Sequence, residues 1–271
     1  MSASTLQLAL FGHPVTHSRS PELHRRFAAQ LGLDVDYRAI DCPAGGLAEA
    51  LDRFAEAGGS GCNLTVPLKA EGLALAASAS AAARSAGACN TLVRRNGGWW
   101  ADTTDGAGLL ADLDRLALDP AGRRLLLVGA GGAMAGVLDA LLERGPARIG
   151  IVNRSAAPAE ALAARVRQAG VPVEVFDFEG GLTAGGFELA LQGTSLGHGG
   201  TAPALDRDWL TGDATAYDLN YGPAHAPFAH WCAMHGVPCH GGWGMLVEQA
   251  AEAFERFTGR RPDTADCYAE R

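Results

Sequence analysis

The stretch Arg124-Leu-Leu-Leu-Val-Gly-Ala-Gly-Gly-Ala-Met-Ala-Gly136 decides the fold class of this chain. Residues Arg124–Val128 have the short apolar pattern of a buried strand, and an apolar helix over Val137–Arg144 follows the glycine-rich turn. Strand, glycine-rich turn and helix together are typical of the start of a doubly wound nucleotide-binding domain. Glycine lets the backbone approach a pyrophosphate closely, and the N-terminus of the helix offers unpaired N–H groups.

The glycine-rich turn departs from a strict Gly-x-Gly-x-x-Gly pattern, because Met134 stands where the third glycine would be. Close packing of strand and helix would also account for such a turn. As a nucleotide site, the turn would hold the cofactor with Gly129, Ala130, Gly131, Gly132 and Ala133.

The next strand, Arg148–Val152, indicates which dinucleotide the domain would bind. It ends in Asn153-Arg154-Ser155, where NAD-selective sites usually carry an acid that bonds the ribose hydroxyls. No acid stands there to repel a phosphate, and Arg154 can donate two N–H groups to one. The pattern favours NADP, with Asn153, Arg154 and Ser155 as cofactor residues; otherwise Arg154 is a solvated loop residue.

Strands and helices alternate on both sides of this motif, which predicts α/β architecture with two domains. Further strands are expected at Leu6–Phe11, Tyr37–Cys42, Cys62–Val66, Cys89–Arg94, Val173–Phe178, Glu188–Leu191 and Ala216–Leu219. Further helices are expected from Ser20 onward and at Leu47–Ala57, Leu109–Leu116, Ala159–Ala169 and Gly244–Thr258, and the Ala/Ser-rich segment 74–88 is also predicted to be helical.

The alternation also predicts how the chain divides. Residues 1–105 plus 241–271 would form a substrate domain with an open, mostly parallel sheet. Residues 106–240 would form the Rossmann-like NADP domain, and the C-terminal helix would return to the first domain.

Composition excludes several classes of protein. The chain has 271 residues, 48% of them hydrophobic, and a net charge of −8, which disfavours nucleic-acid binding. No apolar run approaches the roughly 20 residues of a membrane span, and the N-terminus lacks a secretion signal, so we expect a cytoplasmic protein with no membrane partner. The His/Cys-rich segment 225–240 matches no zinc spacing and is better explained by a helix and a strand, so no metal site is predicted.

Lys69 is the only lysine, although lysine and arginine together number 22. A lysine amine can release its proton in a partly buried site, whereas an arginine guanidinium does not. Chance would also leave one surface lysine. As a functional residue, Lys69 is the first candidate for proton transfer.

Polar side chains gather where apolar strands stop. Asn63, Asn90, Asn153 and Asn220 each stand in a short segment that also carries Thr, Asp or Arg. Turn chemistry explains each asparagine separately, because its amide bonds nearby backbone. It does not explain why they cluster at strand ends, which is where α/β proteins bind ligands.

These motifs, taken in order and spacing along the whole chain, resemble the shikimate dehydrogenase family. The matching segments are Phe11-Gly-His-Pro-Val-Thr-His-Ser-Arg-Ser-Pro21, Asn63-Leu-Thr-Val-Pro-Leu-Lys69, Gly87-Ala-Cys-Asn-Thr91, Asp102-Thr-Thr-Asp-Gly106, Val128-Gly-Ala-Gly-Gly-Ala133, Asn153-Arg-Ser155, Thr194-Ser-Leu-Gly197, Tyr217-Asp-Leu-Asn-Tyr221 and Gly242-Trp-Gly-Met-Leu-Val-Glu-Gln249.

The resemblance implies NADPH-dependent reduction of 3-dehydroshikimate to shikimate in aromatic amino-acid biosynthesis. It implies that Lys69 and Asp105 are the catalytic pair, and that Thr194 and Gly242 join the cofactor site. The residues it implies for the substrate are Ser18 and Ser20 at its carboxylate, and Thr65, Asn90, Asp105, Tyr221 and Gln249 at its hydroxyls and carbonyl.

The chemistry suits these residue types. When a hydride reaches a carbonyl carbon, the oxygen gains negative charge, and a nearby cation or proton donor stabilises it. Lys69 would either donate the proton or mainly stabilise the oxyanion, with Asp105 holding it in place. Taken alone, Asp105 would be read as a helix cap, and Ser18 and Ser20 as caps too.

The sequence also departs from the family pattern. Thr103 stands beside Asp105 where the family usually has Asn, Gln192-Gly193 replaces Asn-Ala, and Pro158 replaces a second basic residue, which leaves Arg154 with less help. The alternatives are a quinate/shikimate dehydrogenase that uses NAD, or a non-catalytic dinucleotide or metabolite sensor. We expect a monomer or a homodimer.

Overall fold

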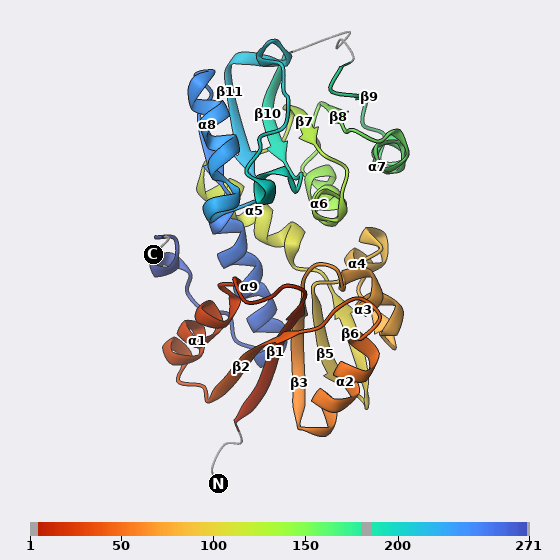
Figure 1. Cartoon of the computed structure of the whole chain (residues 1–271), viewed down its shortest axis with the longest axis vertical. Coiled ribbons are helices and arrows are strands. Elements are labelled where there is room, and N and C mark those ends of the chain that lie inside the picture. Colours follow the sequence, from red (N-terminus) through yellow and green to blue (C-terminus); the bar gives the residue numbers. More distant parts are fainter. Residues whose placement is uncertain (1–4, 180–185, 270–271) are drawn as a thin grey trace. The chain divides into compact units, whose positions relative to one another are not determined.

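The computed structural model describes residues 5–179 and 186–269. The chain divides into two compact units, drawn in Figure 1. Unit 1 contains the chain up to Gly108 and again from Leu246 onward, and unit 2 runs from Leu109 to Met245. The chain passes from one unit to the other within α5 (Asp105–Arg115) and within α9 (Trp243–Thr258). The C-terminal helix therefore lies mostly in unit 1, as predicted.

Unit 1 is built on a six-stranded sheet with the order β2-β1-β3-β5-β6-β4. Its strands are β1 (Leu6–Gly12), β2 (Val35–Asp41), β3 (Gly59–Leu64), β4 (Ser78–Ala79), β5 (Thr91–Arg95) and β6 (Gly98–Asp102). Its other helices are α1 (Ser20–Leu31), α2 (Leu47–Glu56), α3 (Lys69–Leu75) and α4 (Ala81–Ala86). β1 pairs in parallel with β2 and β3, whereas β5 is antiparallel to both β3 and β6.

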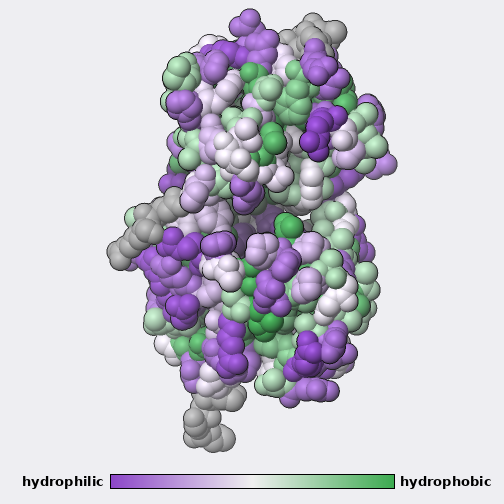
Figure 2. All heavy atoms as spheres, in the orientation of Figure 1, coloured by the Kyte–Doolittle hydropathy of each residue, from purple (hydrophilic) through white to green (hydrophobic). Residues whose placement is uncertain are grey.

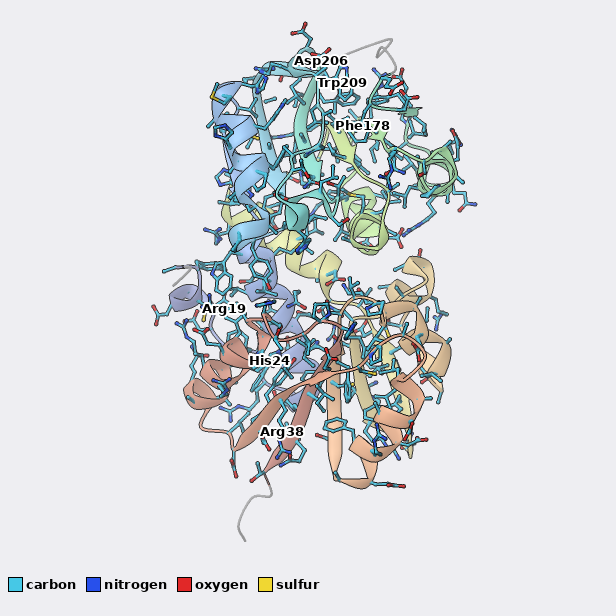
Figure 3. The ribbon with its side chains drawn as sticks, viewed as in Figure 1. Arg19, His24, Arg38, Phe178, Asp206 and Trp209 are labelled. Atoms are coloured by element: carbon cyan, nitrogen blue, oxygen red, sulfur yellow. The ribbon has the colours of Figure 1, made fainter. Side chains whose placement is uncertain are left out.

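Helices cover both faces of this sheet, which explains the continuous apolar run of β1. Ala9 and Phe11 belong to a core shared with α2 and α4, while Leu8 and Leu10 belong to a core on the opposite face. On that opposite face, Phe27 of α1 packs edge-on against Phe254 of α9 at 5.8 Å between ring centroids. The same face buries His24, which projects from α1 towards the sheet (Figure 3).

Segment 74–88 is helical only at 74–75, the end of α3, and at 81–86, which form α4, so the prediction of a helix over the whole segment is wrong. α3 ends at Leu75, and Ala77 N donates to Trp99 O at 2.9 Å. β4 then pairs with β6, and Ser80 caps α4 by accepting a hydrogen bond from Ala83 N at 3.1 Å. Pairing with β6, a strand absent from the prediction, interrupts the helix.

Unit 2 contains a parallel sheet with the order β12-β11-β10-β7-β8-β9. Its strands are β7 (Arg124–Val128), β8 (Arg148–Val152), β9 (Val173–Phe176), β10 (Phe187–Gln192), β11 (Leu210–Asp218) and β12 (Cys239–Gly241). Its other helices are α6 (Gly132–Glu143), α7 (Ala156–Gln168) and α8 (Ala226–Met234). Numbered within the unit, this order is 3-2-1-4-5-6, that of a Rossmann-like dinucleotide fold.

Alternate residues of β7 pack on opposite faces of the unit 2 sheet. Leu125 and Leu127 join the core formed with α6 and α7, and Leu126 and Val128 join the core formed with α8. The reversal of strand order occurs between β7 and β10, at whose ends the glycine-rich turn and Thr194 lie. Ligands bind at such a switch point in doubly wound folds.

On the face shown in Figure 2, hydrophilic and hydrophobic residues are interspersed over the surface of each unit. Within residues 5–179 and 186–269, no helix combines the length and the hydropathy needed to cross a membrane.

Candidate active site

Lys69 and Asp105 form an ion pair in unit 1, with 2.6 Å between Lys69 Nζ and Asp105 Oδ2. Each is the first residue of a helix, Lys69 of α3 and Asp105 of α5. Their side chains are 26% and 11% exposed, so the pair is shielded but still reachable by a ligand. An ammonium has three donors. With one of them on Asp105, two remain for a bound oxygen.

Asn90, which directly precedes β5, fixes the other side of the Asp105 carboxylate. Its Nδ2 donates to Asp105 Oδ1 at 2.9 Å, while Lys69 occupies Oδ2. Its Oδ1 accepts from Thr91 Oγ1 at 2.8 Å and from Thr104 N at 2.9 Å. Asn90 is only 3% exposed, so its side chain is surrounded by these protein groups and not by solvent.

Thr104 and Gln249 complete the cluster. Asn90 Nδ2 lies 2.9 Å from Thr104 Oγ1 and 3.1 Å from Gln249 Oε1, and Thr104 Oγ1 donates to Gln249 O at 2.9 Å. α9 thereby brings Gln249 to residues more than a hundred positions earlier in the chain. The structure thus assembles Lys69, Asn90, Asp105 and Gln249. It adds Thr104, which was not predicted although it directly precedes Asp105 in the Asp102–Gly106 motif.

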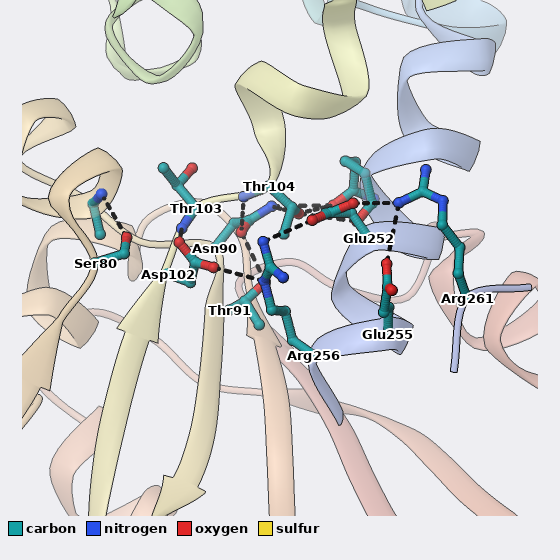
Figure 4. A network of polar contacts seen from close by, with 12 residues as sticks. Ser80, Asn90, Thr91, Asp102, Thr103, Thr104, Glu252, Glu255, Arg256 and Arg261 are labelled. Carbon is teal, nitrogen blue, oxygen red and sulfur yellow. Dashed lines mark hydrogen bonds and ion pairs between the residues drawn. The ribbon is translucent and has the colours of Figure 1, made fainter. Parts of the chain in front are cut away.

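The loop before Asp105 is anchored from α9. Asp102 is 5% exposed and accepts hydrogen bonds from Arg256 Nε and from Thr103 N, both at 2.9 Å. Arg256 also pairs with Glu252 at 2.7 Å, and Figure 4 shows this network beside Thr104 and Asn90. The anchor holds the end of β6, from which Thr104 and Asp105 follow.

Cys89 feels the charges of Lys69 and Asp105, and its thiol does not compete with Lys69 as a base. Burial raises the pKa of Cys89 to about 12, against the opposing effect of the Lys69 charge. The thiol therefore stays protonated at neutral pH. Its backbone N–H donates to Lys69 O at 2.9 Å, which ties α3 to the start of β5.

Ser18 and Ser20 lie at the start of α1. Ser18 Oγ accepts from Ser20 N and donates to Ser20 Oγ, both at 3.2 Å. The cap position is Arg19, which makes no capping hydrogen bond through its side chain. The two serines thus contact each other, at a helix end that favours anions.

Thr65 follows β3 and is partly buried. A Cβ built on Gly12, at the end of β1, would lie 2.2 Å from Thr65 Cγ2, so glycine makes room for the threonine. Among the described residues, the structure gives no side-chain hydrogen bond from Ser18, Ser20 or Thr65 to the Lys69 cluster.

The glycine-rich turn of unit 2 packs closely at Gly129 and is open at Gly131 and Gly132. Gly129 has φ +95°, and a Cβ there would lie 2.8 Å from Thr194 Cγ2. Cβ atoms on Gly131 and Gly132 would meet nothing within 4 Å, so the turn is open where α6 begins. Ala130 N donates to Asn153 Oδ1 at 3.2 Å, which joins this turn to the end of β8.

The loop after β8 carries the predicted phosphate clamp. Asn153 Nδ2 donates to Ser155 O at 2.8 Å, and Arg154 and Ser155 are both exposed. Arg154 forms no ion pair within the described part of the chain, so its guanidinium is available to an anion. Ala133 lies within α6, beside this region, and is exposed.

Gly193, a departure from the family pattern, lies beside Met134, which departs from the strict Gly-x-Gly-x-x-Gly pattern. Met134 is fully buried, and a Cβ on Gly193 would lie only 3.0 Å from Met134 Cε. Glycine at position 193 therefore accommodates the methionine that replaces the third glycine of the turn.

Thr194, Gly242 and Tyr221 also lie in unit 2. Thr194 Oγ1 is buried and has no hydrogen-bond partner among the described residues. Gly242 N donates to Asn220 O at 2.8 Å, and a Cβ there would lie 2.5 Å from Leu219 O. Tyr221 packs edge-on against Trp243, with 5.9 Å between ring centroids.

The histidines and cysteines of segment 225–240 lie on α8, on β12 and in the loops beside them. Within residues 5–179 and 186–269, no cluster of three or more His, Cys, Asp or Glu side chains could hold a metal ion. His225 instead pairs with buried Asp218, at 3.0 Å between Nδ1 and Oδ2.

Three family models match the chain. Residues 10–92 match the shikimate dehydrogenase substrate binding domain, residues 113–179 match shikimate / quinate 5-dehydrogenase, and residues 242–270 match the shikimate 5'-dehydrogenase C-terminal domain.

Individual proteins are similar over nearly the whole chain. A protein from Xanthomonas euvesicatoria pv. vesicatoria, named shikimate dehydrogenase (NADP(+)), is 47% identical over 269 residues, covering 96% of this chain and 93% of the relative. The structure of an Ael1 enzyme from Pseudomonas putida has a TM-score of 0.89 and 35% identity, and covers 97% of both chains. The shikimate 5-dehydrogenase of Thermus thermophilus, in complex with NADP(H) and shikimate, has a TM-score of 0.85 and 32% identity, again covering 97% of both chains.

Proposed function

Because this chain belongs to the shikimate dehydrogenase family, we propose that it reduces 3-dehydroshikimate to shikimate with NADPH, and catalyses the reverse oxidation. It is an oxidoreductase of the shikimate pathway. The observation that carries its chemistry is the ion pair of 2.6 Å between Lys69 and Asp105, bordered by amide and hydroxyl groups. A sensor on the same scaffold would have no use for this pair.

Lys69 would act at the carbonyl oxygen of the substrate. Bound NADPH supplies the hydride. As negative charge develops on the oxygen, the ammonium within about 3 Å stabilises it and provides a proton. Asp105 holds Lys69 Nζ in place by a charge-assisted hydrogen bond, leaving two of its hydrogens for the substrate.

A polyol substrate needs partners for each hydroxyl that it buries. We assign this role to Thr65, Asn90, Asp105, Tyr221 and Gln249. Asn90, Asp105 and Gln249 support the assignment because they lie in one hydrogen-bonded cluster with Lys69. The carboxylate of the substrate would bind Ser18 and Ser20, since hydroxyls at the start of α1 can donate to an anion that the helix dipole favours.

Unit 2 would bind NADP. The open turn at Gly131 and Gly132 leaves space for the pyrophosphate at the start of α6, as at other helix N-termini that bind phosphates. The exposed guanidinium of Arg154 would clamp the 2′-phosphate. Gly129, Ala130, Ala133, Asn153, Ser155, Thr194 and Gly242 would line the rest of the cofactor site. The unpaired Thr194 hydroxyl supports this fit, since a bound ligand can supply its missing partner.

Steady-state oxidation of shikimate and of quinate, each with NADP and with NAD, tests this function. We expect the highest kcat/KM for shikimate with NADP. The quinate/shikimate alternative requires comparable turnover of quinate and a preference for NAD. A protein that binds shikimate without turning it over would be the sensor instead.

We also propose a cytoplasmic enzyme that is a monomer or a homodimer and needs no nucleic-acid or membrane partner. The cysteines of the described chain are unbonded, which fits a reducing compartment. Sedimentation at micromolar concentration would distinguish a monomer from a dimer.

A further inference from the structure

We propose that Thr91 positions the catalytic pair, as the central link of a buried hydrogen-bond chain that runs from Tyr37 through Asn63 to Asn90. This inference rests on the function proposed above, since it concerns the same ion pair. Each of the four side chains is less than 9% exposed, and none hydrogen-bonds to Lys69 within the described part of the chain. They come from β2, β3 and the start of β5, three strands of the unit 1 sheet.

At Asn63, a backbone carbonyl fixes the donor-to-acceptor direction of this series of hydrogen bonds. Asn63 Nδ2 lies 3.1 Å from Asn90 O, and a carbonyl can only accept a hydrogen bond. The amide of Asn63 must therefore present its nitrogen to Asn90 and Thr91, and its oxygen to Tyr37, whose hydroxyl lies 2.8 Å away. Burial raises the pKa of Tyr37 well above its ordinary value, so the hydroxyl keeps the proton that it donates.

A backbone N–H fixes the direction in the same way at Asn90. Thr104 N can only donate, so the atom of Asn90 that faces it at 2.9 Å must be the oxygen, Oδ1. The Thr91 hydroxyl lies between the two amides. Its oxygen accepts from Asn63 Nδ2 at 3.1 Å, and its one hydrogen is left for Asn90 Oδ1 at 2.8 Å.

Through Asn90, this hydrogen-bond chain also orients the carboxylate of Asp105. Two donors on Asn90 Oδ1 hold the amide with its nitrogen towards Asp105 Oδ1, and Asp105 Oδ2 is left for Lys69. Donors in series polarise one another in a buried site, so each strengthens the next. Without the Thr91 hydroxyl, Asn63 Nδ2 would lose an acceptor and Asn90 Oδ1 would lose a donor.

Thr91→Val tests the proposal because it removes the hydroxyl at nearly constant volume. We expect kcat for shikimate oxidation to fall about tenfold, with KM changed far less, since an unpaired buried amide loosens the catalytic pair. The acid limb of the kcat–pH profile should move to higher pH, because a less well bonded carboxylate takes up a proton more readily. Thr91→Ser, which restores a hydroxyl, should recover most of the loss.

Thr258→Val is the matched control. Thr258 is partly buried in the same unit. Among the described residues, its hydroxyl bonds within its own helix, to Phe254 O at 2.8 Å, and in the turn after it, to the backbone O and N of Arg260, both at 3.2 Å. Unchanged kcat and pH profile in folded Thr91→Val would overturn the proposal, as would a loss equal to that of Thr258→Val.

If Thr91→Val fails to fold, Tyr37→Phe is the deciding variant. A lower kcat with the same displaced acid limb supports the proposed hydrogen-bond chain, and wild-type kcat and pH profile overturn it.

A second readout does not depend on the reaction. In the ligand-free protein, the side-chain NH₂ of Asn90 should exchange slowly with water by NMR, and faster in Thr91→Val. If the wild type fails to oxidise shikimate, the proposed function is wrong, yet this exchange still tests the hydrogen-bond chain. Equal exchange in both proteins would contradict the chain even in an active enzyme.

Discussion

Lys69 Nζ meets the Asp105 carboxylate at 2.6 Å, and this contact gives the amine its fixed position. We expect Lys69→Ala to lower kcat by about two orders of magnitude or more, the usual contribution of a general acid. Lys69→Arg keeps the charge but not a readily released proton, so it should lose a similar amount. Steady-state kinetics with shikimate and NADP measures both losses, and KM for shikimate should change far less.

Lys69→Arg is the more informative of the two variants. Near-normal turnover in that variant would show that a permanent cation suffices, and that no proton from residue 69 is needed. Thermal unfolding of each variant separates lost chemistry from lost folding.

Arg154 is exposed and unpaired within the described residues, so its effect can be isolated. We expect Arg154→Ala to lower the ratio of kcat/KM for NADPH over NADH by about tenfold, because a charge-assisted contact to the 2′-phosphate is lost. Arg167→Ala is the control: it removes the same charge from the end of α7, where Arg167 pairs with Glu160. An unchanged ratio in Arg154→Ala would mean that other residues recognise the phosphate.

At the scale of elements, β7 and β8 could be predicted closely, whereas β11 begins at Leu210 and not at the predicted Ala216, and β6 was not predicted. The observed bounds of β7 and β8 match their predicted bounds, because apolar runs buried on both faces are easily recognised. The β5–β6 hairpin does carry a sequence signal, the dipeptide Asn96-Gly97, whose φ angles of +50° and +80° are those of an Asn-Gly hairpin turn. β4 has only two residues, and no local pattern distinguishes it from the helices beside it.

The loop between β6 and α5 depends on a second element, α9. Arg256 of α9 bonds buried Asp102, and its own side chain is 39% exposed, so solvent screens part of the pair. We expect Arg256→Ala to lower the free energy of unfolding by about 1–2 kcal/mol, since Asp102 keeps only one of its two partners. It should also lower kcat, because Thr104 and Asp105 follow directly from this loop.

Urea denaturation of Arg256→Ala should be compared with that of Arg53→Ala. Arg53 forms an exposed pair with Glu49 one turn away on α2, and such pairs contribute about 0.5 kcal/mol or less. Equal stability losses in the two variants would show that the Asp102 anchor is no stronger than a surface ion pair.

At the scale of the whole molecule, the candidate site in unit 1 unites residues 69, 90, 105 and 249. Lys69 and Asn90 were nominated by their residue type and position in the sequence, whereas Asp105 and Gln249 were nominated through the family resemblance. Tertiary pairing decides such contacts: Gln249 O accepts from Thr104 only because α9 packs across β6 and α1. The position of Asn63 at a strand end was noticed in the sequence, but its hydrogen bond to Tyr37 was not predicted, because that contact joins two strands that are far apart in sequence.

His24 is the buried group that links protonation to the stability of the protein. It is fully buried and stacks on Tyr37, with 4.1 Å between ring centroids and 15° between planes. Neither ring nitrogen has a hydrogen-bond partner within the described residues. Burial without a partner disfavours the charged imidazolium and lowers the pKa of His24 to about 3.

This depressed pKa makes stability depend on pH with a definite sign. Below about pH 6.5 the unfolded chain binds a proton at His24 that the folded protein does not, so the free energy of unfolding falls as pH falls. The loss approaches about 1.4 kcal/mol per pH unit between pH 6 and 4. Urea denaturation from pH 7.5 to 5 should show a shallower dependence in His24→Leu than in the wild type, whereas His230→Gln, at an exposed position, should follow the wild type closely. Parallel curves for His24→Leu and the wild type would contradict this prediction. They would mean that His24 takes up a proton as readily in the folded protein as in the unfolded chain.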